Sequence, residues 1–148
     1  MDKIFCAGYY NSWIRGTRSE IIRETRNKNG MLHSFDDEPC LVVHEESIDG
    51  TVIFINEMWG NNGVVHRVGG PALISIIEGE DDLEKTHDVL SMYIQNGKYH
   101  REDGPFKTGD SVICPKYYVK GMWFEKEDFP KALRKFVSEE AAIMPILS

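Results

Sequence analysis

Short runs of β-branched and aromatic residues alternate with polar segments along most of this chain, which favours strands joined by turns and loops. Some of these runs precede an Asn-Gly or Lys-Gly pair, and others follow a proline. The predicted strands are EIIRETR (20–26), CLVV (40–43), TVIFINEMW (51–59), ALISII (72–77), VLSMYIQ (89–95), SVIC (111–114) and KYYV (116–119). We also expect an edge strand in KIFCAGYY (3–10) and a turn at NSW (11–13). The pattern predicts a mainly β fold.

The polar segments between these runs are predicted to be loops that face water. They are HEESIDG (44–50), EGEDDLEKTHD (78–88) and KTGD (107–110). The middle segment is the longest and the most acidic. A short helical turn within DDLEKTHDVL (81–90) is compatible with its composition.

The segment 125–138 has a different periodicity. One apolar stripe at helical spacing is formed by Phe129, Ala132, Leu133, Phe136 and Val137. Pro130 is acceptable in the first helical turn, and acidic residues precede it. We predict an amphipathic helix that stops near Pro145 and caps the open end of the sheet, as terminal units of repeat arrays do.

Three segments repeat an Asn-Gly-x-x-His motif that is followed by a proline, with Gly-to-Gly periods of 33 and 34 residues. A truncated fourth copy, YYVKGMWF (117–124), has Lys120-Gly121 at the Asn-Gly position and Phe124 at the His position. Asn-Gly favours a two-residue type I′ hairpin turn, and Gly-Pro should interrupt the strand ladder. The repeated positions are Asn29, Gly30, His33 and Pro39 in the first copy, Asn62, Gly63, His66, Arg67, Gly70 and Pro71 in the second, and Asn96, Gly97, His100, Arg101, Asp103, Gly104 and Pro105 in the third.

The repeats define the predicted organisation of the chain. Its 148 residues are enough for a single domain with one core. The copies occupy about residues 20–50, 51–88 and 89–124, and the capping helix about 125–138. The predicted fold class is a mainly β, repeat-built antiparallel β-hairpin meander sheet with a short C-terminal amphipathic α-helix.

With Asn-Gly-x-x-His-Arg-x-x-Gly-Pro in register, the chain resembles a family of β-hairpin repeats that is described as a variant of the MORN repeat. That family is typified by NGKxHREDGPA, and the third copy, NGKYHREDGP (96–105), matches it nearly completely. The resemblance covers about residues 20–136. Such repeats occur in largely uncharacterised proteins of large DNA viruses, satellite viruses, phages and some bacteria. The resemblance implies a meandering antiparallel sheet without agreed catalytic residues.

Composition narrows the functional classes. The net charge of −7 disfavours binding to nucleic acids or anionic membranes, and no run approaches the ~20 apolar residues of a membrane span. Cys6, Cys40 and Cys114 lack the C-x-x-C spacing of zinc or redox sites, so reduced buried thiols are expected. The N-terminal residues lack the pattern of a signal peptide. We therefore expect a soluble intracellular protein without a cofactor.

The repeated histidines have two interpretations. A column of His33, His66 and His100 could bind a metal, but successive hairpins advance roughly 10 Å and zinc requires nitrogens about 2.0–2.1 Å away. We therefore favour imidazoles that bond neighbouring backbone groups and pack under the next hairpin, and we assign no metal ligand.

Two other sets of side chains resemble functional sites. Arg67 and Arg101 with Glu102-Asp103 could form an acid/base pair with a clamp, but Gly69 stands at the Asp103 position of the second copy. We therefore assign no catalytic residue. A register of aromatic residues near the turns is more often core than ligand platform, but if exposed it would form an interaction surface. It consists of Trp59, Tyr93 and Tyr118.

The sequence thus predicts a non-catalytic protein-interaction or self-assembling module rather than an enzyme. A protein partner or a second copy is the expected ligand, because an open array exposes sheet edges. The resemblance points to a viral protein in the host cytoplasm. The first alternative is a virion-associated structural protein, and the second is a metal-dependent enzyme that uses the repeat histidines.

Overall fold

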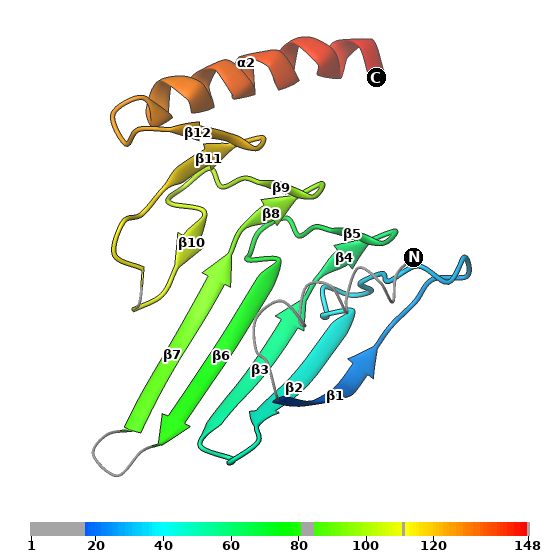
Figure 1. Cartoon of the computed structure of the whole chain (residues 1–148). Helices are drawn as coiled ribbons and strands as arrows, with labels where there is room; N and C mark the ends of the chain where they lie inside the picture. The colour runs from blue at the N-terminus through cyan, green and yellow to red at the C-terminus, as the bar shows by residue number, and fades with distance from the viewer. Residues whose placement is uncertain (1–16, 81–84, 111, 148) are drawn as a thin grey trace.

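The computed structural model describes residues 17–80, 85–110 and 112–147. Over these ranges the chain is mainly β, its paired strands are antiparallel, and a helix follows at the C-terminal end (Figure 1). The predicted fold class is therefore confirmed. The predicted strand at 3–10 and the predicted turn at 11–13 lie outside the described residues.

The longer strands form a six-stranded sheet within the described residues, in the order β1-β2-β3-β6-β7-β10. β-Branched residues, which favour strands, are frequent in β3 (VIFINEM) and β6 (LISIIEGE), and these two strands pair along seven positions in the middle of this sheet. The strands are β1 (Thr17–Glu24), β2 (Leu41–Ser47), β3 (Val52–Met58), β6 (Leu73–Glu80), β7 (Lys85–Met92) and β10 (Lys107–Thr108).

Three short hairpins leave one end of this sheet and lie beside one another (Figure 1). Their strands are β4 (Gly60–Asn61), β5 (Val64–Val65), β8 (Ile94–Gln95), β9 (Lys98–Tyr99), β11 (Tyr117–Val119) and β12 (Met122–Phe124). In the first copy, a single bridge between Arg26 and Leu32 closes the equivalent loop. We call this loop and the three hairpins the hairpin stack.

The hydrophobic core lies where the long strands meet the hairpin stack. Its residues come from both parts, so the core joins them. The largest fully buried side chains are those of Leu32, Cys40 and Leu41. The rest of the cluster consists of Val43, Met58, Val65, Ala72, Leu73 and Ile94.

The turns of the later copies have the predicted type I′ geometry. Both central residues have positive φ at Asn62-Gly63 (49° and 81°), Asn96-Gly97 (52° and 75°) and Lys120-Gly121 (50° and 81°). The prediction is wrong for the first copy, where Gly30 (φ 78°) but not Asn29 has positive φ. There the Gly30 N–H bonds the Asn27 carbonyl, so the loop contains one more residue.

Two predicted loops are mostly strand, because the long strands extend further than the apolar runs. HEES of 44–47 belongs to β2, and both ends of the acidic segment 78–88 belong to β6 and β7. The helical turn suggested for 81–90 is therefore wrong over 85–90, and 81–84 lie outside the described residues.

The predicted strand at 111–114 is also wrong over its described residues, 112–114. The outermost strand of the sheet is instead β10, which pairs with β7 through Lys107 and Thr108. Pairing ends there because the Asp88 side chain accepts the Asp110 N–H at 3.0 Å.

The helix α2 (Phe129–Leu147) packs against β11, so it caps the hairpin stack rather than the six-stranded sheet (Figure 1). The Phe129 ring lies 4.9 Å from that of Tyr117. Two predictions are wrong: the helix continues through Pro145, and Val137 is exposed rather than part of the buried stripe. Among the described residues, no helix has the length and apolar character to span a membrane.

Candidate functional site

The repeat histidines connect each hairpin to the next. In each case the imidazole Nδ1 accepts the backbone N–H of the first turn residue in the following copy. These bonds run from Asn62 N to His33 (3.2 Å), from Asn96 N to His66 (2.9 Å) and from Lys120 N to His100 (2.9 Å). A neutral imidazole that accepts at Nδ1 carries its proton on Nε2. The arrangement therefore uses the one lone pair that could bind a metal or accept a proton.

The turn glycines make a second set of contacts between copies. In the later copies, the glycine N–H donates to a backbone carbonyl of the preceding copy, and the glycine itself has a left-handed φ. The bonds run from Gly63 to Leu32 (2.8 Å), from Gly97 to Val65 (2.9 Å) and from Gly121 to Tyr99 (2.8 Å). Histidine and glycine together fix the position of every following turn.

Both ends of the hairpin stack are closed. In the first loop, Asn27 Oδ1 accepts the N–H groups of Asn29 (3.0 Å) and Met31 (3.1 Å), so turn donors are satisfied without a preceding histidine. In the last hairpin, Phe124 stands at the histidine position and has no acceptor to offer a further copy. Asn27 was not predicted as a site residue, although this asparagine precedes the first motif by only two residues.

The repeat arginines pack on the aromatic register. Arg67 Cζ lies 3.9 Å from the Trp59 ring centroid, and Arg67 Nη1 donates to the Pro71 carbonyl at 3.1 Å. A Cβ on Gly70 would lie 3.0 Å from Arg67 Cζ, so a larger residue would displace the guanidinium. The third copy repeats this geometry with Arg101, whose Cζ lies 3.9 Å from the ring of Tyr93, with Pro105 and with Gly104. The Arg-x-x-Gly-Pro spacing is thus a packing motif.

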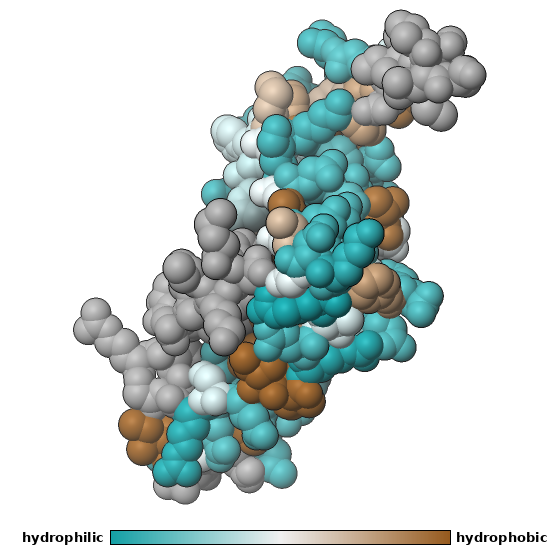
Figure 2. Space-filling view, turned by 90° about the vertical axis from the view of Figure 1, so that its right-hand side faces the viewer, coloured by the Kyte–Doolittle hydropathy of each residue, from teal (hydrophilic) through white to brown (hydrophobic). Residues whose placement is uncertain are grey.

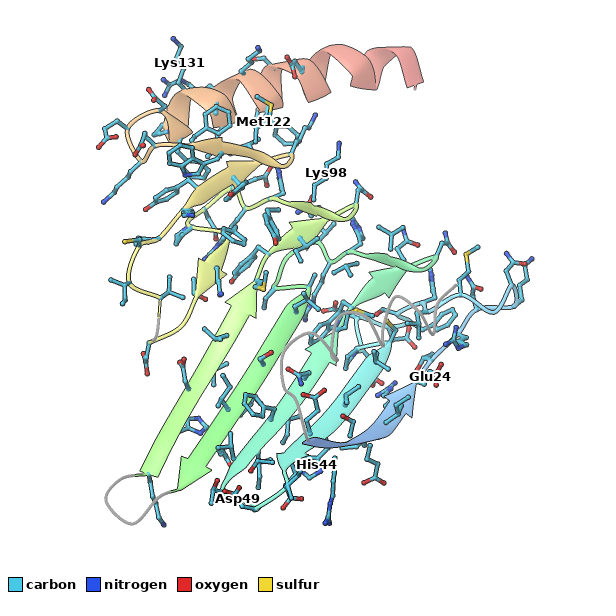
Figure 3. The ribbon with its side chains drawn as sticks, in the orientation of Figure 1. Glu24, His44, Asp49, Lys98, Met122 and Lys131 are labelled. Carbon is cyan, nitrogen blue, oxygen red and sulfur yellow. The ribbon has the colours of Figure 1, made fainter. Side chains whose placement is uncertain are left out.

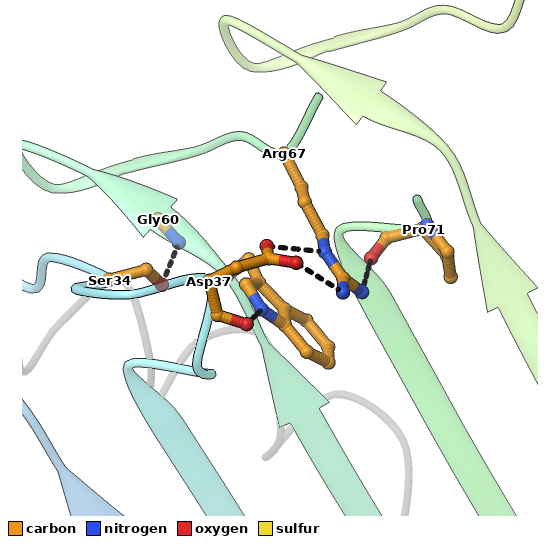
Figure 4. A network of polar contacts seen from close by, with 6 residues as sticks. Ser34, Asp37, Gly60, Arg67 and Pro71 are labelled. Carbon is orange, nitrogen blue, oxygen red and sulfur yellow. Dashed lines mark hydrogen bonds and ion pairs between the residues drawn. The ribbon is translucent and has the colours of Figure 1, made fainter. Parts of the chain in front are cut away.

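The two arginines differ in their acidic partners. Arg67 forms a two-pronged pair with Asp37 of the preceding copy (3.0 and 3.1 Å), and the Asp37 carbonyl accepts the Trp59 indole N–H (Figure 4). Arg101 instead binds Asp103 of its own copy at 2.8 Å. The arginine in each pair lowers the carboxyl pKa of its aspartate. Asp37 was not predicted; it lies in the segment HSFDDEP, where the first copy has one residue more than the later copies between its histidine and its proline.

His100 is the most enclosed polar group of the stack. Only 3% of it is exposed, and its Nε2 has no hydrogen-bond partner among the described residues, since Glu102 Oε1 lies 3.8 Å away. Burial, together with Lys120, lowers its pKa, and Glu102 opposes this shift. The imidazole is therefore held neutral.

A cleft of about 560 Å³ lies beside His100, between the β8–β9 hairpin, the β11–β12 hairpin and α2. It is lined by Gln95, Asn96, Lys98, His100, Lys120 and Phe136. Lys98 lies on the β8–β9 hairpin and Met122 on the β11–β12 hairpin (Figure 3). The Phe136 ring contacts both His100 (5.2 Å) and Lys120 Nζ (4.3 Å), so the helix closes one side of the cleft. This lining provides cationic and amide donors but no paired carboxylates for acid/base chemistry.

The remaining candidate groups do not assemble into a centre. Within the described residues, no group of three or more His, Cys, Asp and Glu side chains is placed to hold a metal ion. Cys40 is buried, which raises its thiol pKa, and Cys114 is exposed; both are free thiols. Cys6 lies outside the described residues.

The aromatic register is not an exposed platform. Trp59 is only 5% exposed beneath Arg67, so its assignment to an interaction surface is wrong. Tyr93 is half-buried beneath Arg101, and half-buried Tyr118 contacts the rings of Tyr99 (5.3 Å) and Phe106 (4.8 Å). Arginines thus cover the first two residues of the register, and other aromatic rings pack on the third.

Comparison with protein-family models, with curated proteins and with solved structures gives no significant match.

Proposed function

We propose that this protein is a non-catalytic protein-interaction or self-assembling β-repeat module. The observation that carries the proposal is that the histidine and arginine side chains of the repeat are engaged in contacts within the hairpin stack. The histidine Nδ1 atoms bond backbone N–H groups, and the arginines bond carbonyls, aspartates and aromatic rings of the stack. Groups committed to such contacts are poor candidates for catalysis, so function is expected from the displayed surface.

The displayed surface includes apolar side chains suited to a protein contact. Viewed from the side of β1 and the hairpin turns, hydrophobic residues form separate patches among hydrophilic ones (Figure 2). The exposed fractions reach 56% for Ile21 and 60% for Ile22 on β1, and 63% for Met122 and 55% for Trp123 on β12. The resemblance to viral hairpin repeats extends the proposal to a viral protein that acts inside the host cell.

The proposal can be tested by metal analysis and thermal unfolding of the wild type and of a His66→Ala/His100→Ala variant. A structural role predicts no stoichiometric metal in the wild type and a lower Tm in the variant, because two backbone N–H groups lose their acceptors. Stoichiometric metal that the variant loses at unchanged Tm would overturn the proposal in favour of the histidine-based enzyme.

A further inference from the structure

The edge strand β1 offers a pairing surface that no other strand uses within the described residues. It is an outer strand of the six-stranded sheet, and within the described residues its only strand partner is β2. It has eight residues, whereas β10 at the opposite edge has two. A long edge with exposed isoleucines is a template for strand addition.

β1 also has features that prevent unselective pairing. Ile22 is the extra residue of a bulge between Ile21 and Arg23, and charged residues are distributed along the strand, including Glu24 (Figure 3). Bulges and charges on an edge exclude arbitrary strands. They do not exclude a strand whose charges are complementary, so they make the edge selective.

We infer that the partner of this edge is a second copy of the same chain, paired antiparallel through β1. This inference rests on the proposed function. The sequence Glu20-Ile21-Ile22-Arg23 is complementary to itself when reversed. A two-fold axis between Ile21 and Ile22 places each Glu20 opposite the Arg23 of the other copy. It also places the isoleucines opposite each other, and opposite charges and apolar pairs across strands are favourable.

The closed ends of the hairpin stack support this choice of surface. Asn27 satisfies the turn donors at one end, and Phe124 and α2 occupy the other. Head-to-tail extension of the stack would break these contacts, whereas pairing through β1 leaves them intact. A two-fold contact through identical strands also closes on itself and yields a dimer rather than a fibre.

The test is the mass of the full chain measured by size-exclusion chromatography with light scattering, up to about 100 µM protein, a range suited to a weak dimer. The wild type is expected to reach twice the 17.0 kDa chain mass. Glu20→Arg and Arg23→Glu should each raise the dimer dissociation constant at least about tenfold, because two pairs become like-charged. Mixing the two variants should restore a heterodimer.

Arg18→Glu is the matched control, since the proposed register places Arg18 opposite the neutral Thr25 and predicts little change. Circular dichroism melts check that each variant folds, because Arg23 also pairs with Glu38. A monomeric wild type, or single reversals that leave dimerisation unchanged, would overturn the inference. Either result would leave the outcome of the metal analysis and the Tm measurement unchanged, so failure of this inference can be distinguished from failure of the proposed function.

Discussion

The hairpin stack and the six-stranded sheet are formed by the same repeats, but different interactions hold them together. In the stack, histidine, glycine and arginine of one copy bond backbone groups of the same or a neighbouring copy. In the sheet, the strands pair through their backbones, and their side chains differ from copy to copy. The recurring residues therefore explain assembly of the stack, and the proposed interaction would depend on the variable residues of the long strands.

The largest expected effect is at His100, where the stack is most enclosed. His100→Ala leaves the Lys120 N–H without an acceptor and opens a cavity beside Phe136. We expect a loss of about 2–4 kcal/mol in the free energy of unfolding, measured by urea denaturation. His100→Gln, which retains an acceptor, should lose less; equal losses would contradict the hydrogen-bonding role.

The two arginines provide a matched comparison within the stack. Arg67 bonds Asp37 of the preceding copy, whereas Arg101 bonds an aspartate of its own copy. Arg67→Ala should cost about 2 kcal/mol in unfolding free energy and Arg101→Ala about 1 kcal/mol. A larger cost at Arg101 would show that the contact between copies is not the stronger one.

A smaller effect is expected at the closed end of the stack. Asn27→Ala removes the acceptor of two turn N–H groups, and a cap of this kind contributes about 1 kcal/mol. Asn27→Asp keeps the side-chain acceptor and should retain most of the stability in the same denaturation experiment. If Asn27→Ala left the unfolding free energy unchanged, water would be able to replace Asn27 as the acceptor of the two turn N–H groups.

The pH dependence should separate the stack from the sheet. Burial lowers the pKa of His100 in the folded chain below its ordinary value of about 6.5, so the unfolded chain binds this proton more readily. The contribution of His100 is therefore fully present above about pH 6.5 and is lost as the pH falls through the folded pKa. Unfolding free energies at about pH 7.5 and 5.5 should differ more in the wild type than in His100→Gln.

The turns of the second and third copies and the strands before them could be predicted because local residues determine them. Asn62-Gly63 and Asn96-Gly97 adopt the type I′ geometry that their sequence favours, and the runs before them form β3 and β7–β8. The strand predicted at 111–114 failed because tertiary contacts decided it. The side chain of Asp88, on a neighbouring strand, binds the Asp110 N–H and ends the pairing.

The contacts within the hairpin stack were only partly predictable, because they join residues that are far apart in the sequence. The recurrence of His66 and His100 indicated a structural role, but the atom that each imidazole bonds lies in the next copy, 30 residues from His66 and 20 residues from His100. Asp37 and Asn27 occur once, so no repeat pattern marked them. Trp59 was considered as a surface residue because the sequence does not show that Arg67 covers it.

The central claim is that the repeat histidines are neutral acceptors that hold the next turn in place. The most direct measurement is long-range ¹H–¹⁵N correlation NMR of the imidazole nitrogens at neutral pH. The account predicts the Nε2–H tautomer, with an unprotonated Nδ1, for His33, His66 and His100. Protonated Nδ1 atoms, or imidazoles that exchange freely between tautomers, would contradict it.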